Sequence, residues 1–224
     1  VSGDVVELKR GERSLRVPVW INPGHAPESL TLYLGYGRTR AGRAGSRTGF
    51  DVNPLRTMAA PFVLSGVEVT KTNDRYTLAC TQDHWSLEGR NIVRVTTASE
   101  FEKDPKVLQK MEHIPLTGLS MYPDYRYDGY AWGMAIDQNV CTGCNSCVVA
   151  CVAENNIPVV GKDQVLNGRE MHWLRVDRYY TGDLENPSTY HQPMPCQQCE
   201  QAPCGVVCPV AATTHSDEGL NDMV

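Results

Sequence analysis

Long apolar runs are absent from this chain of 224 residues, and basic charge is in short supply. The longest unbroken apolar run, residues 147–153, is seven residues long. A helix that crosses a bilayer needs about 20, so we expect no membrane-crossing segment. Lysine and arginine number 21 against 26 aspartates and glutamates, which gives a net charge of −5. This balance disfavours general binding to a phosphate backbone, and we expect no nucleic-acid partner.

Cysteine is nearly missing from the first half of the chain, where Cys80 stands alone. The other eight cysteines lie between Cys141 and Cys208. Charge divides in the same way, since residues 1–112 carry 16 basic and 13 acidic side chains and residues 113–224 carry 5 and 13. Both shifts predict two lobes, 1–112 and 134–224. Residues 113–133 are rich in tyrosine and tryptophan, so they predict an ordered connector whose rings pack between the lobes.

The first lobe is predicted to be mainly β, and the whole chain mixed α+β. Residues 5–8 and 15–21 alternate between apolar and polar side chains around a turn, which is typical of a hairpin with one buried face. Pro18 places its strand at a sheet edge. Three further strands are expected at 30–34, 63–69 and 92–95, and a helix at 99–111.

A loop at residues 35–49 combines several glycines with four arginines: Arg38, Arg40, Arg43 and Arg47. Glycine allows a backbone to approach an anion closely and arginine favours phosphate, so one interpretation is a pyrophosphate cradle. No helical pattern follows the loop, so it matches neither a Walker A nor a Rossmann fingerprint. A solvated or interface loop is the favoured interpretation.

The most specific feature is a pair of cysteine runs. The first is C-x2-C-x2-C-x3-C, formed by Cys141, Cys144, Cys147 and Cys151. The second is C-x2-C-x4-C-x3-C-P, formed by Cys196, Cys199, Cys204 and Cys208 before Pro209. Three thiolates on one tight loop can bind three corners of an iron–sulfur cube, and in ferredoxin runs the fourth cysteine serves the partner cluster. We therefore predict that these eight cysteines are metal and cofactor ligands, and we predict no catalytic residue.

Other interpretations of these residues are less favoured. Disulfides are disfavoured because closely packed cysteines have few strain-free pairings. Structural zinc would use two CxxC pairs for one tetrahedral ion, whereas each run here has further members. The histidines near the runs in sequence, His172, His191 and His215, are expected to be ordinary loop or surface residues. A strand at 132–140, a helix at 146–155 and a strand at 172–180 are expected around the first run.

Residues 141–161, 173–176 and 194–213 resemble the four-cluster ferredoxin subunits that accompany molybdopterin oxidoreductases. Residues 3–55 and 82–90 are similar to the C-terminal double-psi β-barrel domain of molybdopterin enzymes. A chain that joins both resembles the fused iron–sulfur subunit of alternative complex III, a bacterial quinol-oxidising complex. The resemblance implies a double-psi barrel lobe followed by a ferredoxin-like iron–sulfur lobe.

The resemblance also implies cofactors, partners and location. The full protein would hold three 4Fe–4S clusters and one 3Fe–4S cluster without molybdopterin, using two further cysteine runs elsewhere in its polypeptide. It would be an interior piece of a protein at the periplasmic face of the bacterial inner membrane. Its partners would be a multi-helix quinol-binding membrane subunit and a multihaem cytochrome c subunit, with electrons passing from quinol towards c-type haems and no catalysis by this chain alone.

Four alternatives stay open from the sequence. The chain could be the electron-transfer subunit of a molybdopterin oxidoreductase or a self-contained two-cluster ferredoxin-like protein. The glycine and arginine loop could bind a molybdopterin dinucleotide. The chain could also be a zinc-stabilised interaction module without a redox role.

Overall fold

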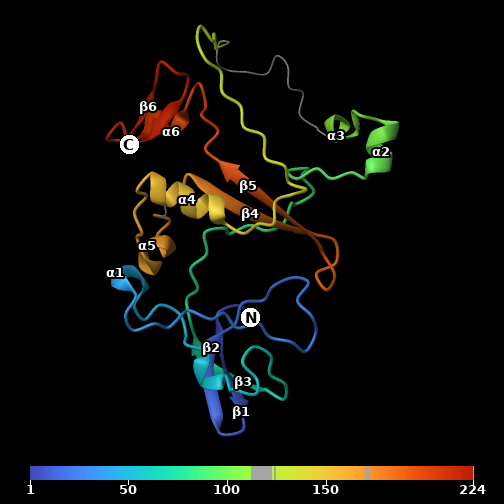
Figure 1. Cartoon of the computed structure of the whole chain (residues 1–224), viewed down its shortest axis with the longest axis vertical. Coiled ribbons are helices and arrows are strands. Elements are labelled where there is room, and N and C mark those ends of the chain that lie inside the picture. The colour runs from blue at the N-terminus through green and yellow to red at the C-terminus, as the bar shows by residue number, and fades with distance from the viewer. Residues whose placement is uncertain (112–122, 124, 170–171, 224) are drawn as a thin grey trace. The chain divides into compact units, whose positions relative to one another are not determined.

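The computed structural model describes residues 1–111, 123, 125–169 and 172–223. It is a mixed α/β fold of short elements, as expected (Figure 1). The strands are β1 (Asp4–Arg10), β2 (Arg13–Pro18), β3 (Glu68–Arg75), β4 (Leu174–Thr181), β5 (Ser188–Pro195), β6 (Thr213–His215) and β7 (Asn221–Met223). The helices are α1 (Gly42–Gly45), η1 (Asn53–Leu55), α2 (Ala98–Lys103), α3 (Val107–Lys110), α4 (Ser146–Glu154), α5 (Lys162–Leu166) and α6 (Pro203–Val207).

Two compact units divide the chain. The first unit comprises Val1–Ser86, Val152–His172 and Tyr180–Thr189, and the second comprises Leu87–Cys151, Trp173–Tyr179 and Tyr190–Val224. All eight cysteines of the two runs belong to the second unit. The predicted lobe boundaries at 112 and 133 stay predictions, and much of the predicted connector, including Tyr122, lies outside the described residues.

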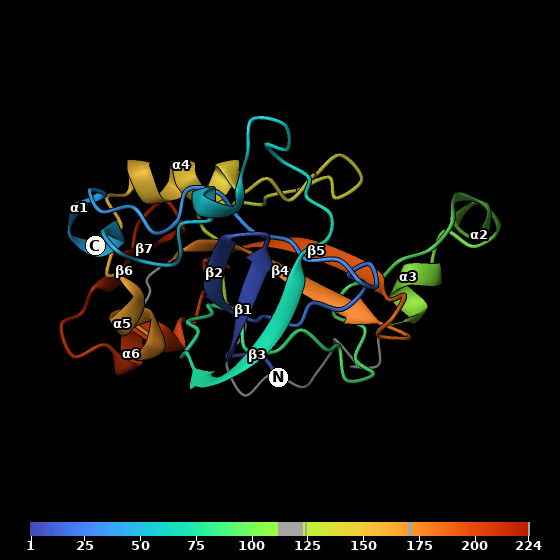
Figure 2. The same cartoon turned by 90° about the horizontal axis from the view of Figure 1, so that it is seen from below.

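A three-stranded antiparallel sheet with the order β2-β1-β3 organises the first unit, and its strands lie side by side in Figure 2. The predicted hairpin is confirmed, because β1 pairs with β2 across the turn at Gly11 and Glu12. Pro18 lies on β2, which is an edge strand as expected. Proline has no backbone N–H, so an edge position costs the sheet no ladder hydrogen bond there.

The core of this unit follows from the alternation along β1. Val6 and Leu8 point to one face and are buried, where they join Val17 of β2 and Leu55 of η1. Leu8 and Leu55 are each only 1% exposed. Full burial of one leucine side chain contributes roughly 1.5–3 kcal/mol, so these few side chains account for much of the stability of the sheet.

Asp4 is a buried carboxylate at the start of β1, and charged side chains of β3 neutralise it. Its carboxylate lies 2.9 Å from Lys71 Nζ and 2.9 Å from Arg75 Nη1. Hydrogen bonds from Lys71 and from the amino group of Val1 lower the pKa of Asp4 to about 2. These ion pairs hold β3 beside β1 although β3 itself is mostly exposed.

Several predicted elements are wrong in type or position. Residues 30–34, 92–95 and 132–140 form no strand, and the strand expected at 63–69 lies instead at Glu68–Arg75. A strand needs a partner, and the polar β3 supplies the pairing that the more apolar 63–67 does not. The helix expected at 99–111 is split into α2 and α3, because Pro105 cannot continue α2 and disfavours a helical residue before it.

The glycine and arginine loop at 35–49 closes on itself. Backbone N–H groups of Gly37 and Arg47 donate to Thr48 O at 2.8 Å and Arg38 O at 2.6 Å. Gly37 has φ +71°, and an added Cβ would lie 2.2 Å from Asp51 N, so only glycine fits there. The pyrophosphate cradle stays an untested alternative.

Around the cysteine runs, the helix and the strand expected at 146–155 and 172–180 are present as α4 and β4. β4 and β5 form one two-stranded sheet, and β6 and β7 form an antiparallel pair near the end of the chain. None of the helices in the described ranges has the length and hydropathy that a bilayer span requires. The double-psi barrel and the ferredoxin-like lobe stay predictions.

Candidate metal centre

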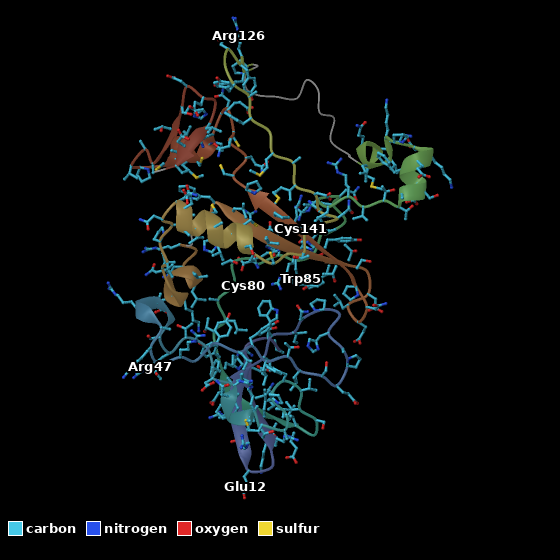
Figure 3. All side chains as sticks on the ribbon, viewed as in Figure 1. Glu12, Arg47, Cys80, Trp85, Arg126 and Cys141 are labelled. Carbon is cyan, nitrogen blue, oxygen red and sulfur yellow. The ribbon has the colours of Figure 1, made fainter. Side chains whose placement is uncertain are left out.

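The first cysteine run occupies a turn, a loop and the start of α4. The backbone N–H of Cys141 donates to Asp137 O at 3.1 Å, which closes the turn before the loop. Figure 3 labels Cys141 on this segment. Gly143 and Asn145 follow with φ of +66° and +62°, so the chain curls tightly between the cysteines. Cys147 and Cys151 both lie in α4 and are four residues apart, which places them on one helix face.

The second run begins at the end of β5 and ends after α6. The N–H of Cys196 donates to Trp173 O at 2.9 Å, which fixes the first cysteine beside the start of β4. Gln198 has φ +51°, so this loop also makes a left-handed bend between its cysteines. α6 begins at Pro203, a residue suited to the first helical position, and its first turn carries Cys204. Cys208 is the residue that caps the C-terminal end of α6.

Two histidines tie these loops to more distant segments. His191 Nε2 lies 2.9 Å from Cys141 O, and His215 Nε2 lies 3.1 Å from Cys199 O. With the tautomer that carries the proton on Nε2, each imidazole donates to a carbonyl of a cysteine. Each run therefore has one histidine that holds its backbone.

Three thiols have hydrogen-bonding neighbours that favour the thiolate. Cys144 Sγ lies 3.2 Å from Ser146 Oγ, and hydrogen bonding with the Ser146 side chain lowers the pKa of Cys144. The N–H of Ala212 donates to Cys208 Sγ at 3.3 Å, and this bond lowers the pKa of Cys208. Asn221 Nδ2 donates to Cys204 Sγ at 3.6 Å. Thiolates, not thiols, bind metal, so these contacts suit ligands.

The donor set fits iron–sulfur clusters in its chemistry. All nine cysteines are free thiols, and each of the eight in the two runs is exposed or half-buried. Within the described ranges, no three His, Cys, Asp or Glu side chains lie close enough together to hold one metal ion. The structure thus places each run on one loop and helix without gathering its sulfur atoms into one set, and the ligand assignment stays a prediction.

Cys80, the lone cysteine of the first half, belongs to the first unit and is labelled in Figure 3. It is half-buried, and its Sγ donates to Gln82 O at 3.0 Å.

The aromatic segment 125–132 contacts the second run and the β6–β7 turn. Tyr127 donates from its hydroxyl to the Glu200 carboxylate, and Trp132 Nε1 donates to Glu218 O at 2.8 Å. Tyr125 and Tyr127 pack edge to face, with ring centroids 4.9 Å apart. All these residues belong to the second unit, so the described rings order the surroundings of the second cysteine run.

Known proteins resemble part of this chain. No protein-family profile matches it. Over 89 residues, 39% of the chain, it is 42% identical to the menaquinone reductase iron–sulfur cluster-binding subunit of Nitratidesulfovibrio vulgaris, of which it covers 34%. It is 38% identical over 89 residues, 40% of the chain, to a selenate reductase subunit of Mesobacillus selenatarsenatis, of which it covers 27%.

A third relative is the Hdr-like menaquinol oxidoreductase iron–sulfur subunit 1 of Archaeoglobus fulgidus. The chain is 31% identical to it over 104 residues, which is 40% of the chain and 37% of the relative. The chain thus spans between about a quarter and two fifths of the length of these relatives. Homologues of the chain are iron–sulfur subunits of multi-subunit oxidoreductases, which supports the prediction that the chain is part of an iron–sulfur subunit.

Proposed function

We propose that this chain is the electron-transfer part of an iron–sulfur subunit in a multi-subunit oxidoreductase. The observation that carries the proposal is the pair of cysteine runs, each placed on a left-handed loop followed by a helix in the second unit. An iron–sulfur cluster held by such thiolates supplies one-electron transfer. The chain itself holds the cluster and sets its surroundings, and it makes or breaks no substrate bond.

The ligand sets follow the ferredoxin pattern. Cys141, Cys144 and Cys147 would hold one cluster, and Cys151 would serve its partner. Cys196, Cys199 and Cys204 would hold another, with Cys208 serving the fourth cluster. Two further cysteine runs of the same polypeptide would complete a set of three 4Fe–4S clusters and one 3Fe–4S cluster. The first lobe would be a double-psi barrel without molybdopterin, and the second lobe would be ferredoxin-like.

The favoured setting is a quinol-oxidising complex at the periplasmic face of a bacterial inner membrane. Two relatives are named for menaquinone and menaquinol, which supports a quinone or quinol partner reaction. A multi-helix membrane subunit would bind the quinol, and a multihaem cytochrome c subunit would accept the electrons. This setting is that of the iron–sulfur subunit of alternative complex III.

A second candidate is the electron-transfer subunit of a molybdopterin oxidoreductase. The similarity to the selenate reductase subunit favours it, because that protein is named as part of a reductase rather than of a quinol oxidase. Metal analysis of the purified native complex separates the two candidates. Molybdenum in stoichiometric amount would favour the second, and its absence together with c-type haem would favour the first.

The experiment that tests the shared core of both candidates counts iron and acid-labile sulfide per copy of the natively purified protein. Four clusters imply about 15 or 16 irons, and two clusters imply about 8. The higher count supports the fused four-cluster subunit, and the lower count supports a self-contained two-cluster carrier. Zinc in place of iron, with no visible absorbance, would overturn the proposal in favour of a zinc-stabilised module.

A further inference from the structure

The β6–β7 pair is fastened to the second cysteine run at several points. The N–H of Asn221 donates to Gln198 Oε1 at 2.7 Å, and His215 Nε2 bonds to Cys199 O at 3.1 Å. His215 and Asn221 are opposite each other in the antiparallel register of this pair. One short hairpin therefore holds the loop of the second run through two neighbouring residues.

Asn221 also reaches a sulfur atom with its side chain. Its Nδ2 lies 3.6 Å from Cys204 Sγ, and the residue is only 2% exposed. Its Oδ1 is buried and has no hydrogen-bond partner among the described residues. A buried amide with an unsatisfied oxygen costs free energy. A favourable interaction of the nitrogen at the other end of the amide would offset this cost.

The chemistry of a thiolate decides which end of the amide faces it. A thiolate sulfur can only accept a hydrogen bond, so the amide must present Nδ2–H₂ to Cys204 and turn Oδ1 away. This is the orientation that the structure has. Among the residues that the structure describes, Oδ1 has no partner because the other end of the amide, Nδ2, points to the sulfur of Cys204.

We propose that Asn221 is a positioning residue whose side-chain amide donates a hydrogen bond to the Cys204 thiolate and thereby raises the reduction potential of the cluster that Cys204 holds. The inference rests on the proposed function. Reduction places one further electron, taken from an external donor, on the cluster and its sulfur ligands, and no bond forms or breaks. A hydrogen-bond donor stabilises the more negative reduced form more than the oxidised form, so the donor favours reduction.

The test is a redox titration of the native complex with dithionite and mediators, followed by electron paramagnetic resonance. Asn221→Leu keeps the size of the side chain and removes the donor. The matched control is Thr214→Ala, which alters an exposed residue of the same hairpin.

In the Leu variant we expect the ratio of reduced to oxidised form of one cluster to fall about threefold or more at a fixed ambient potential. At 59 mV per tenfold change for a one-electron couple, a threefold fall corresponds to a reduction potential that is lower by about 28 mV. The control should titrate as wild type.

Wild-type protein without iron and labile sulfide would overturn the proposed function. A fully loaded Asn221→Leu protein with the wild-type potential for every cluster would overturn the role of Asn221 alone. If the Leu variant does not load, Asn221→Val, a smaller residue suited to a strand, takes its place under the same criterion.

A second measurement keeps the inference testable even if neither variant loads. Protein that retains Asn221 is prepared with ¹⁵N in its asparagine side chains, and the reduced protein is examined by pulsed electron paramagnetic resonance. Because Asn145 lies next to Cys144 in the first run, the labelled protein also carries Asn145→Gly, and hyperfine coupling between the electron spin and an amide nitrogen in it supports the hydrogen bond to Cys204. Absence of any such coupling overturns it.

Discussion

The β1–β3 sheet and the two cysteine runs obtain their order from different interactions. In the sheet, alternating apolar residues are buried against each other, and Leu8 and Leu55 are 1% exposed. In the runs, the cysteine side chains are exposed or half-buried, and α4 and α6 bury none of their residues. Apolar packing therefore fixes the sheet, whereas the loops are fixed by left-handed residues and by hydrogen bonds from distant side chains.

Stability and the candidate site can therefore be perturbed separately. A change in the sheet core removes buried apolar area, and the hydrogen bonds that hold the cysteine loops lie in the other unit. A change at a cysteine removes a donor atom and little buried area. A variant that lowers the free energy of unfolding and the iron content together would contradict this separation.

Loss of one cysteine ligand should have the largest effect. For Cys144→Ser we expect loss of one cluster, about four irons per copy, because a serine hydroxyl is a poor substitute for a thiolate. Iron analysis and electron paramagnetic resonance of the purified complex measure the loss. Cys80→Ser is the control and should retain the full iron content, since Cys80 belongs to the first unit and is not part of either run. An unchanged iron content in Cys144→Ser would contradict the ligand assignment.

Truncation of the sheet core should give the largest effect on stability. We expect Leu8→Ala to lower the free energy of unfolding of the first unit by about 2–5 kcal/mol, through lost burial and the cavity that remains. Urea unfolding followed by the fluorescence of the protein measures it. Val63→Ala, at a side chain that is 83% exposed, should change the same free energy by no more than about 0.5 kcal/mol. A large loss of iron from folded Leu8→Ala protein would show that sheet and runs are not separable.

The parts of the fold that could be predicted from the sequence are those whose order comes from local patterns. The β1–β2 hairpin was predictable because alternation and a tight turn are local signals. The position of β3 was not, because its residues are polar and its strand character comes from ion pairs and pairing with β1, far away in the chain. Residues 30–34 and 92–95 have the apolar composition of strands and form none, since composition does not supply a partner.

For the candidate site, spacing alone identifies the cysteines and the helix that carries Cys147 and Cys151. It does not identify His191, His215 or Asn221, because nothing in their local sequence distinguishes them from ordinary loop and strand residues. Their contacts join residues 50, 16 and 17 positions apart, and no local pattern encodes such contacts. Side chains that hold a loop from outside become visible only when the fold brings them together.

Loss of a histidine contact should therefore have an intermediate effect on how firmly the protein retains iron. In His191→Ala we expect iron to leave the protein about two- to tenfold faster in the presence of a chelator, since one hydrogen bond contributes about 0.5–1.5 kcal/mol to holding the Cys141 loop. His191→Gln, which keeps an N–H donor, should lose iron more slowly than His191→Ala. His172→Ala is the control, because His172 is exposed and belongs to the first unit. Equal rates for wild type and His191→Ala would show that the loop needs no such support.

The smallest effect is expected at the start of α2, where order is also local and comes from hydrogen bonds. Thr97 Oγ1 accepts from Glu100 N at 3.3 Å, and the Glu100 carboxylate accepts from Thr97 N at 3.0 Å, which forms a capping box. The hydrogen bonds that the backbone N–H and then the hydroxyl of Thr97 donate to the carboxylate lower the pKa of Glu100. Thr97→Ala should cost about 0.5–1 kcal/mol of local helix stability and speed amide exchange about two- to fivefold within Ala98–Lys103.

Hydrogen exchange read by mass spectrometry, with Ser99→Ala as the matched control in the same turn, measures this effect. The location of the change is as informative as its size. If order in the second unit is local, exchange in β1 stays as in wild type, because the apolar residues described around Leu8 include none from α2. Faster exchange in β1 after Thr97→Ala would instead mean that the two kinds of order are coupled, and the separation of stability from the cysteine site would no longer hold.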